Sequence, residues 1–275
     1  MDNAPIGVFD SGVGGLSILR QLRLLLPSEK VLFFADQAHV PYGPRPLAEV
    51  RRFSIGIARF LLGRGAKLIV VACNTASAAA LQDMRSALPS TPFVGMEPAV
   101  KPAAEQTRTR TVGVLATPAT FQGALFASVV ERFAQGVRVI PQTLPGLVER
   151  IEAGDLNGPE THRILEAGVA PLVAQGADTL VLACTHYPFV IPAIAAIAGP
   201  GVQVIDPSPA IARQAARLLD ERGLRSNETG RGEVAYLTSG DPVRLGEMAI
   251  RLIGEAGTVR GANWDSAGET LSLAG

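Results

Sequence analysis

The sequence has no excess of charge of either sign and no long apolar run. Its 275 residues include 25 basic and 25 acidic side chains, so the formal net charge is zero, and no basic cluster stands out. A dedicated nucleic-acid-binding protein normally carries a basic surface, so this class is disfavoured. The apolar stretches have the length of strands, far short of the roughly 20 residues that cross a bilayer. We predict neither a nucleic-acid partner nor a membrane-spanning segment.

Side chains that bind metals or cofactors are also few. The chain has three histidines and two cysteines, Cys73 and Cys184, and only His186 lies near a cysteine. A structural zinc site needs about four such ligands, so the sequence disfavours one. None of the three lysines lies in a strand-end motif, which disfavours a pyridoxal cofactor bound as a Schiff base. The sequence therefore disfavours both a structural zinc site and a pyridoxal cofactor.

The first residues and the cysteine content bear on the compartment. The chain begins Met-Asp-Asn and leads into an apolar run at 6–9, without a cationic segment followed by an apolar one. This pattern is not that of a secretory signal. Two cysteines at apolar-to-loop transitions are typical of a reducing compartment. We expect a cytoplasmic protein.

The chain contains an internal repeat. The segments 60–75 and 171–186 align at a constant offset of 111 positions, and six residues recur in order. Each copy carries one cysteine, Cys73 or Cys184, directly after a short apolar run. Strand-and-helix patterns can align by chance, but six identities in order favour a true duplication. Two related halves that face each other would place one thiol on each side of a shared cleft.

Short, continuously apolar runs alternate with helix-length segments of 3,4 apolar spacing. Such runs are typical of buried parallel strands, and the alternation predicts an α/β fold with helices on both faces of the sheets. We predict two pseudo-symmetric lobes, each with a mostly parallel sheet, and an active site in the cleft between them. Lobe one comprises 1–97 and 207–275, and lobe two comprises 98–206. The expected strands are 6–9, 31–34, 68–72, 111–115, 137–140, 179–183 and 202–205.

The C-terminal part of the chain is less regular in sequence. We predict a helix over 207–221 and a polar loop over 227–233. From about residue 255 the chain is rich in Gly, Ala and Ser, which predicts a weakly ordered tail.

Each cysteine lies where an expected strand passes into a helix. Asn74 or Thr75 can cap a helix over 76–88, and Pro188 suits the first turn of a helix after Cys184. Ligands of open α/β sheets bind at this carboxyl edge. A helix N-terminus there favours a substrate carboxylate and lowers the pKa of a nearby thiol. The alternatives are two inert core cysteines or a disulfide across the cleft, and equivalent cap-flanked positions in a reducing compartment disfavour both.

A glycine-rich turn at 11–15, SGVGG, follows the first expected strand and opens a helix. It nearly matches the dinucleotide-binding fingerprint, but Ser17 stands where the last Gly or Ala belongs, and the P-loop lysine is missing. We interpret the glycines as a tight turn that brings Asp10 and Ser11 over the cleft. Asp10 can orient a thiol or a substrate ammonium group, with a simple helix cap as the alternative.

Further polar residues are candidates for the same site. His186, two residues after Cys184, is the best candidate for a general-base helper. Glu149 and Glu152 lie on one helical segment, and the residues alone do not decide which carboxylate serves the site. The loop Pro41-Tyr42-Gly43 carries a polar aromatic side chain and is either a lid or a surface turn.

Six motifs are distributed along positions 5–221. They are FDSGVGGLS at 9–17, PYG at 41–43, ACNTAS at 72–77, TPATF at 117–121, LVE at 147–149 and ACTHYP at 183–188. ACNTAS and ACTHYP at this separation form a highly specific pair, whereas DSGVGG alone is moderately specific. Together these motifs resemble those of bacterial glutamate racemases, within the aspartate/glutamate racemase superfamily.

The resemblance implies an isomerase that interconverts L- and D-glutamate without a cofactor and supplies D-glutamate for peptidoglycan. By similarity, Cys73 takes the α-proton from D-glutamate and Cys184 takes it from L-glutamate. Asp10 would assist Cys73, and Glu149 and His186 would assist Cys184. We also expect a homodimer. The residues that fall where the family contacts its substrate are Asp10, Ser11, Pro41, Tyr42, Gly43, Asn74, Thr75, Thr117, Thr120, Thr185 and His186.

The sequence departs from the family pattern in two places. Arg45-Pro46 follows the PYG loop where many members carry Lys-Ser, and the segment after about residue 255 matches no family motif. The alternative functions are an aspartate racemase, a decarboxylase of the same superfamily, and a two-lobed amino-acid-binding protein. Aspartate racemases usually carry a different opening motif and lack this PYG loop. Decarboxylase relatives usually need only one cysteine. The missing export signal counts against a binding protein.

Overall fold

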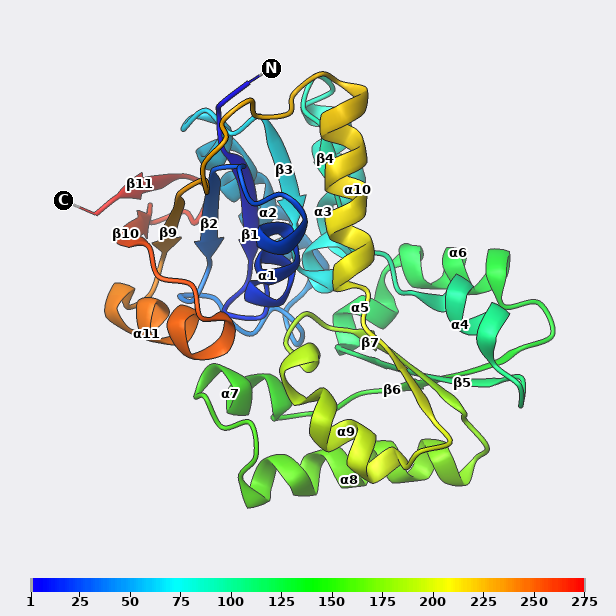
Figure 1. The fold of residues 1–275 in the computed structure, drawn as a ribbon. Helices are drawn as coiled ribbons and strands as arrows, with labels where there is room; N and C mark the ends of the chain where they lie inside the picture. The colour runs from blue at the N-terminus through cyan, green and yellow to red at the C-terminus, as the bar shows by residue number, and fades with distance from the viewer. Residues whose placement is uncertain (1, 275) are drawn as a thin grey trace.

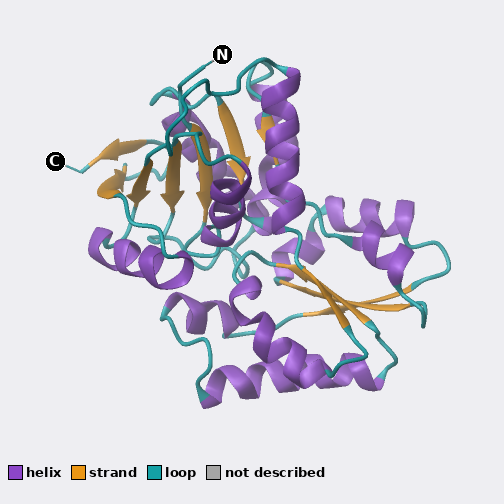
Figure 2. Ribbon diagram, in the orientation of Figure 1, coloured by secondary structure: helices purple, strands orange, loops and turns teal. Residues whose placement is uncertain are grey.

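The strands of the protein form two separate sheets, in a computed structural model that describes residues 2–274 (Figure 1). One sheet has seven strands in the order β11-β10-β9-β2-β1-β3-β4, and the other has four in the order β6-β5-β7-β8. Helices flank both sheets, as Figure 2 shows. The predicted α/β fold with mostly parallel sheets is therefore confirmed.

The seven-stranded sheet combines strands from the two ends of the chain. All of its neighbouring strands are parallel except β11, which pairs antiparallel with β10. Its strands are β1 (Ile6–Asp10), β2 (Val31–Ala35), β3 (Leu68–Val71), β4 (Phe93–Val94), β9 (Val234–Thr238), β10 (Thr258–Trp264) and β11 (Leu271–Leu273).

The four-stranded sheet is built from the middle of the chain and is entirely parallel. Its strands are β5 (Thr111–Ala116), β6 (Arg138–Gln142), β7 (Thr179–Ala183) and β8 (Gln203–Ile205). Its order repeats that of β2-β1-β3-β4 in the larger sheet. Under this equivalence β7 corresponds to β3, as the internal sequence repeat requires. The division into lobes at 97/98 and 206/207 stays a prediction.

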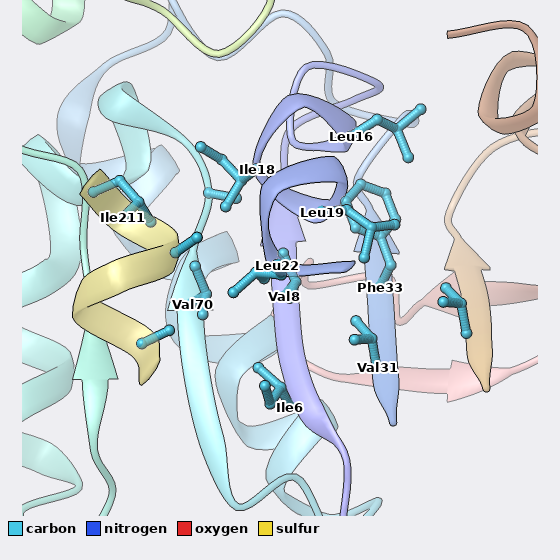
Figure 3. Close-up of a cluster of buried hydrophobic side chains, with 14 of the residues drawn as sticks. Ile6, Val8, Leu16, Ile18, Leu19, Leu22, Val31, Phe33, Val70 and Ile211 are labelled. Atoms are coloured by element: carbon cyan, nitrogen blue, oxygen red, sulfur yellow. The ribbon is translucent and has the colours of Figure 1, made fainter. Parts of the chain in front are cut away.

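Helices cover both faces of the larger sheet because its strands are apolar on both sides. Inward side chains of α1, such as Leu19 and Leu22, pack with Val8 and Val70 on one face, together with Ile211 (Figure 3). The other face packs against α2 and α3. The helices beside this sheet are α1 (Leu16–Leu25), α2 (Leu47–Leu62), α3 (Asn74–Ala87), α10 (Ser208–Glu221) and α11 (Pro242–Ile253).

The smaller sheet is covered in the same way. One face packs against α7, α8 and α9, and the other against α4 and α6. None of the helices within residues 2–274 is both long and apolar enough to cross a bilayer. The remaining helices are α4 (Val100–Gln106), α5 (Pro118–Gln122), α6 (Ala124–Phe133), α7 (Leu147–Glu152), α8 (Pro159–Ala174), a 3₁₀ turn η1 (Tyr187–Val190) and α9 (Ile191–Ala198).

The expected strands are confirmed, with ends that differ by one or two residues. The predicted tail after about residue 255 is wrong, because β10 and β11 form a hairpin that extends the larger sheet. The apolar face of this hairpin packs against α2, which a composition rich in small residues does not reveal. The 227–233 loop is confirmed, and the helix predicted over 207–221 begins one residue later, at Ser208.

Candidate active site

The two cysteines line one narrow cavity between the two sheets. Cys73 follows β3 and Cys184 follows β7, so each thiol stands at the carboxyl edge of its own sheet. Both thiols are reduced and nearly buried, with relative exposures of 5% and 6%. The cavity is lined by Ser11, Pro41, Tyr42, Gly43, Cys73, Asn74, Thr75, Thr117, Val148, Cys184, Thr185 and His186.

Cys73 itself caps helix α3. Its extended backbone continues the strand, and its sulfur accepts a hydrogen bond from the Ala76 N–H at 3.5 Å. The expectation that Asn74 or Thr75 caps this helix is therefore wrong, because both residues already lie inside its first turn. A helix N-terminus directly beside the sulfur places partial positive charge at the Cys73 thiol.

Asp10, at the end of β1, stands behind Cys73. Its carboxylate accepts hydrogen bonds from the Gly15 N–H at 2.6 Å and from the Thr185 hydroxyl at 3.3 Å. Burial raises the pKa of the Cys73 thiol well above its ordinary value, and the charge of Asp10 raises it further. Burial also raises the pKa of Asp10, against the opposing effect of His186. Asp10 is thus a stronger base than a solvated carboxylate and lies within reach of the thiol.

Two other side chains, His186 and Glu152, lie next to Cys184. His186 Nδ1 lies 3.8 Å from the sulfur, and its Nε2 lies 2.6 Å from Glu152 Oε1. The same Glu152 oxygen accepts a hydrogen bond from the Val13 N–H at 2.7 Å. Burial alone would lower the pKa of His186, but the hydrogen bonds with Cys184 and Glu152 raise it well above its ordinary value. Burial would raise the pKa of Glu152, but its hydrogen bond with His186 and the charge of that residue lower it.

The carboxylate next to His186 is Glu152, not Glu149. Both belong to α7, but Glu152 is buried against the glycine-rich turn, whereas Glu149 is exposed. Glu149 lines a neighbouring cavity together with Pro41, Gly43 and Tyr187. The structure thus places a second carboxylate, Glu152, beside His186, and the expectation that Glu149 assists Cys184 stays a prediction.

The glycine-rich turn makes room for side chains that come from the other sheet. A Cβ at Gly12 would overlap the Glu152 carboxylate, and one at Gly14 would lie 2.6 Å from the Thr185 hydroxyl and overlap His186. A Cβ at Gly15 would lie 2.7 Å from Asp10 Cβ. These glycines therefore permit Asp10, Glu152 and His186 to lie close to the turn.

One wall of the cavity offers uncharged polar groups. The hydroxyls of Thr75 and Thr117 lie 2.8 Å apart, and Thr120 lies behind them, 3.0 Å from Thr117. The side-chain amide of Asn74 is buried, and neither its oxygen nor its nitrogen has a partner within the described residues. An amide that is buried without partners is suited to a polar ligand that supplies them.

Asp36 is a buried residue near the site that sequence reasoning missed. Its carboxylate accepts a hydrogen bond from the Tyr42 hydroxyl at 2.6 Å, and burial raises the pKa of that phenol well above its ordinary value. Arg45 of the following turn bonds to the His39 carbonyl at 2.6 Å. The only signal in the sequence was that Asp36 comes two residues after the expected strand at 31–34, much as Asp10 directly follows 6–9.

Two arginines of α11 hold the end of α7 against the larger sheet. Arg244 donates to the Glu152 carbonyl at 2.9 Å, and Arg251 donates to the Gly154 carbonyl at 2.8 Å. Cationic donors at a helix C-terminus satisfy its free carbonyls. The helix that carries Glu152 is thereby fixed at both its backbone and its carboxylate.

The His186–Glu152 contact predicts how stability depends on pH. In the folded state the pKa of His186 is raised above its unfolded value of about 6.5. The contribution of protonated His186 to the stability of the fold is therefore complete below about pH 6.5, and it is lost as the pH rises through the folded-state pKa. We expect the difference in free energy of unfolding between wild type and His186→Asn to shrink as the pH rises from about 6 to 9. Urea denaturation at several pH values measures this difference. His162→Asn, at an exposed position on α8, is the control. A difference that grows with pH would contradict the contact.

Comparisons with known proteins agree on one family. A family model described as Asp/Glu/Hydantoin racemase matches residues 15–215. A glutamate racemase of Roseiflexus sp. is 53% identical over 249 residues, which cover 90% of this chain and 92% of that protein. The structure is similar to that of a glutamate racemase isoform from Bacillus anthracis, with a TM-score of 0.86, 28% identity, and coverage of 98% and 100% of the two chains. It is also similar to a Francisella tularensis glutamate racemase solved with D-glutamate, with a TM-score of 0.82, 30% identity, and coverage of 94% and 96%.

Proposed function

Because the chain belongs to the Asp/Glu/Hydantoin racemase family, we propose that it interconverts L- and D-glutamate by moving the α-proton between two thiols. The observation that carries this proposal is that Cys73 and Cys184, from two equivalent strands, line the same cavity. A proton taken from one side of Cα and returned from the other inverts the centre. Relatives that cover most of the chain are named for this reaction, and one of them was solved with D-glutamate.

In the proposed mechanism, Cys73 takes the α-proton of D-glutamate while Cys184 donates a proton to the opposite face. The same two steps in the opposite sense convert L-glutamate. Asp10 accepts and returns the proton of Cys73. His186, held by Glu152, exchanges a proton with Cys184 through its Nδ1. Each thiol thus has its own proton partner, a carboxylate on one side and an imidazole on the other.

The chemistry is within the reach of these groups. A thiol with the reference pKa of about 8.5 needs ~2 kcal/mol to become a thiolate at pH 7, and burial raises this cost for Cys73, so its proton must be accepted by Asp10. General acid–base transfer contributes about 10²- to 10⁴-fold, less than most enzymes achieve in total. The remainder must come from fixed dipoles that stabilise negative charge on the substrate carboxylate. We assign this role to the start of α3, the Asn74 amide and the hydroxyls of Thr75 and Thr117.

The proposal also covers the metabolic role and the assembly of the protein. The product D-glutamate would supply peptidoglycan synthesis in the cytoplasm, where thiols stay reduced. We propose a homodimer as the working form. A sedimentation measurement of the purified protein would establish the number of subunits.

The substrate assay tests the function directly. Incubation of the purified protein with either enantiomer of glutamate should yield the racemate, followed by the loss of circular dichroism and by chiral chromatography. Aspartate should react far more slowly, and no CO₂ should be released from either amino acid. Preferential racemisation of aspartate, decarboxylation, or binding of glutamate without any exchange of the α-hydrogen would each contradict the proposal.

A further inference from the structure

Asp36 is a fully buried carboxylate whose two oxygens are completely used by the protein. One oxygen, Oδ1, accepts hydrogen bonds from the Trp264 indole N–H at 2.8 Å and the Ser239 hydroxyl at 2.7 Å. The other, Oδ2, accepts the Tyr42 hydroxyl at 2.6 Å and lies 2.9 Å from His39 Nδ1. A carboxylate accepts about four hydrogen bonds, so no acceptor site remains for a substrate. Asp36 is therefore part of the scaffold.

The groups that hold Asp36 come from distant parts of the chain. His39 and Tyr42 belong to its own loop, Ser239 directly follows β9, and Trp264 ends β10, 228 residues away. Both C-terminal donors bond to Oδ1, the Tyr42 hydroxyl bonds to Oδ2, and His39 Nδ1 lies within 3.1 Å of both oxygens. The two C-terminal hydrogen bonds therefore help to fix the rotation of the carboxylate. The direction in which the Tyr42 hydroxyl points follows from that rotation.

The indole ring has little freedom to move. It packs against Phe53 with ring centroids 5.5 Å apart and meets the edge of His39 at 5.6 Å. A Cβ at Gly56 would lie 2.8 Å from the ring, so this glycine on α2 leaves just enough space for it. These contacts hold the half-buried indole so that its N–H points at Asp36.

Tyr42 connects this network to the catalytic cavity. It lines the cavity together with both cysteines, but it shares a buried hydrophobic cluster with Cys73 and not with Cys184. Its neighbour Gly43 accepts a hydrogen bond from the Ala119 N–H at 3.1 Å. The raised pKa of Tyr42 keeps its hydroxyl protonated and so preserves the bond to Asp36. A displaced Tyr42 would change the wall against which Cys73 approaches the substrate.

We propose that Trp264 is a positioning residue for the Cys73 half of the reaction, acting through Asp36 on Tyr42. The proposal rests on the two-thiol racemisation proposed above. It gives the C-terminal hairpin a role in catalysis: β10 carries the donor that sets the Cys73 wall of the cavity. Because Tyr42 packs in the same buried cluster as Cys73, whereas Cys184 belongs to another cluster, the effect should be confined to proton transfer at Cys73.

Trp264→Phe tests the proposal, since it removes the N–H and retains an aromatic ring. Loss of one hydrogen bond to a buried carboxylate should lower kcat/KM about tenfold. The fall in kcat/KM must be equal for D-to-L and L-to-D conversion, because the two enantiomers of glutamate have equal free energies. The diagnostic readout is the primary isotope effect with α-deuterated substrates. With D-glutamate it should rise, because proton removal by Cys73 becomes slower, and with L-glutamate it should fall, because proton donation by Cys73 then limits the rate.

Two further variants separate positioning from stability. Ser239→Ala removes the other donor to the same oxygen and should change both isotope effects in the same directions. Leu273→Ala, on β11, weakens the packing of the hairpin without touching Asp36 and should lower the melting temperature alone. Wild-type isotope effects in both Trp264→Phe and Ser239→Ala would overturn the inference while wild type still racemises glutamate. A wild-type protein inactive on glutamate would instead overturn the proposed function.

Discussion

Cys73→Ser and Cys184→Ser are each expected to slow glutamate racemisation by about 10³-fold or more. A serine hydroxyl is a far weaker acid than a thiol, so it neither removes the α-proton at neutral pH nor exchanges it rapidly with Asp10 or His186. The replacement is nearly the same size and preserves the packing around each strand end. Racemisation followed by circular dichroism measures the loss.

The two cysteine variants are controls for each other. In Cys73→Ser, Cys184 still faces the α-hydrogen of L-glutamate, so solvent deuterium should enter L-glutamate slowly and D-glutamate not at all. Cys184→Ser should show the opposite preference. Loss of exchange with both enantiomers in a well-folded variant would argue against independent thiols, and full racemisation by either variant would remove the basis of the mechanism.

Gly14→Ala is expected to lower the rate of racemisation by about 10²-fold although it changes no group that reacts. The added methyl would overlap His186 and lie 2.6 Å from the Thr185 hydroxyl, so both residues after Cys184 must move. A displacement of about 1 Å in a catalytic group can reduce the rate by this amount. Overpacking of a tight site should also destabilise the fold by about 1–3 kcal/mol.

Gly201→Ala is the matched control for the glycine-rich turn. A Cβ at Gly201 meets nothing within 4 Å, so its rate and melting temperature should equal those of wild type. Activity should be measured at a temperature where Gly14→Ala is fully folded, as judged by its melting curve. A folded Gly14→Ala protein with the wild-type rate would show that His186 does not need its observed position.

The sequence predicted the strands that are buried on both faces, because such strands are continuously apolar. β1, β3 and β7 are examples, and every residue in them is buried. It did not predict β10, in which a single residue, Ala262, is fully buried and the others are exposed or half-buried. The evidence for this strand lies in its pairing with β9 and its packing on α2, which are contacts over long sequence separations.

The residues of the candidate site that lie at strand ends could be predicted from the sequence. Cys73, Cys184 and Asp10 directly follow or end apolar runs, and the internal repeat linked the first two. The choice between Glu149 and Glu152 was not predictable, because it depends on how α7 is rotated against the Val13 N–H. The role of Asp36 was hidden for a similar reason, since its partners Ser239 and Trp264 are more than 200 positions away.

Racemisation of D-glutamate in D₂O, stopped at low conversion, tests most directly whether two opposed groups handle the α-proton. Thiols exchange with solvent, so the proposed mechanism predicts L-glutamate that carries deuterium at Cα and recovered D-glutamate that retains its hydrogen. Deuterium in the recovered D-glutamate at the same level as in the product would show that one group serves both faces, and would contradict the account.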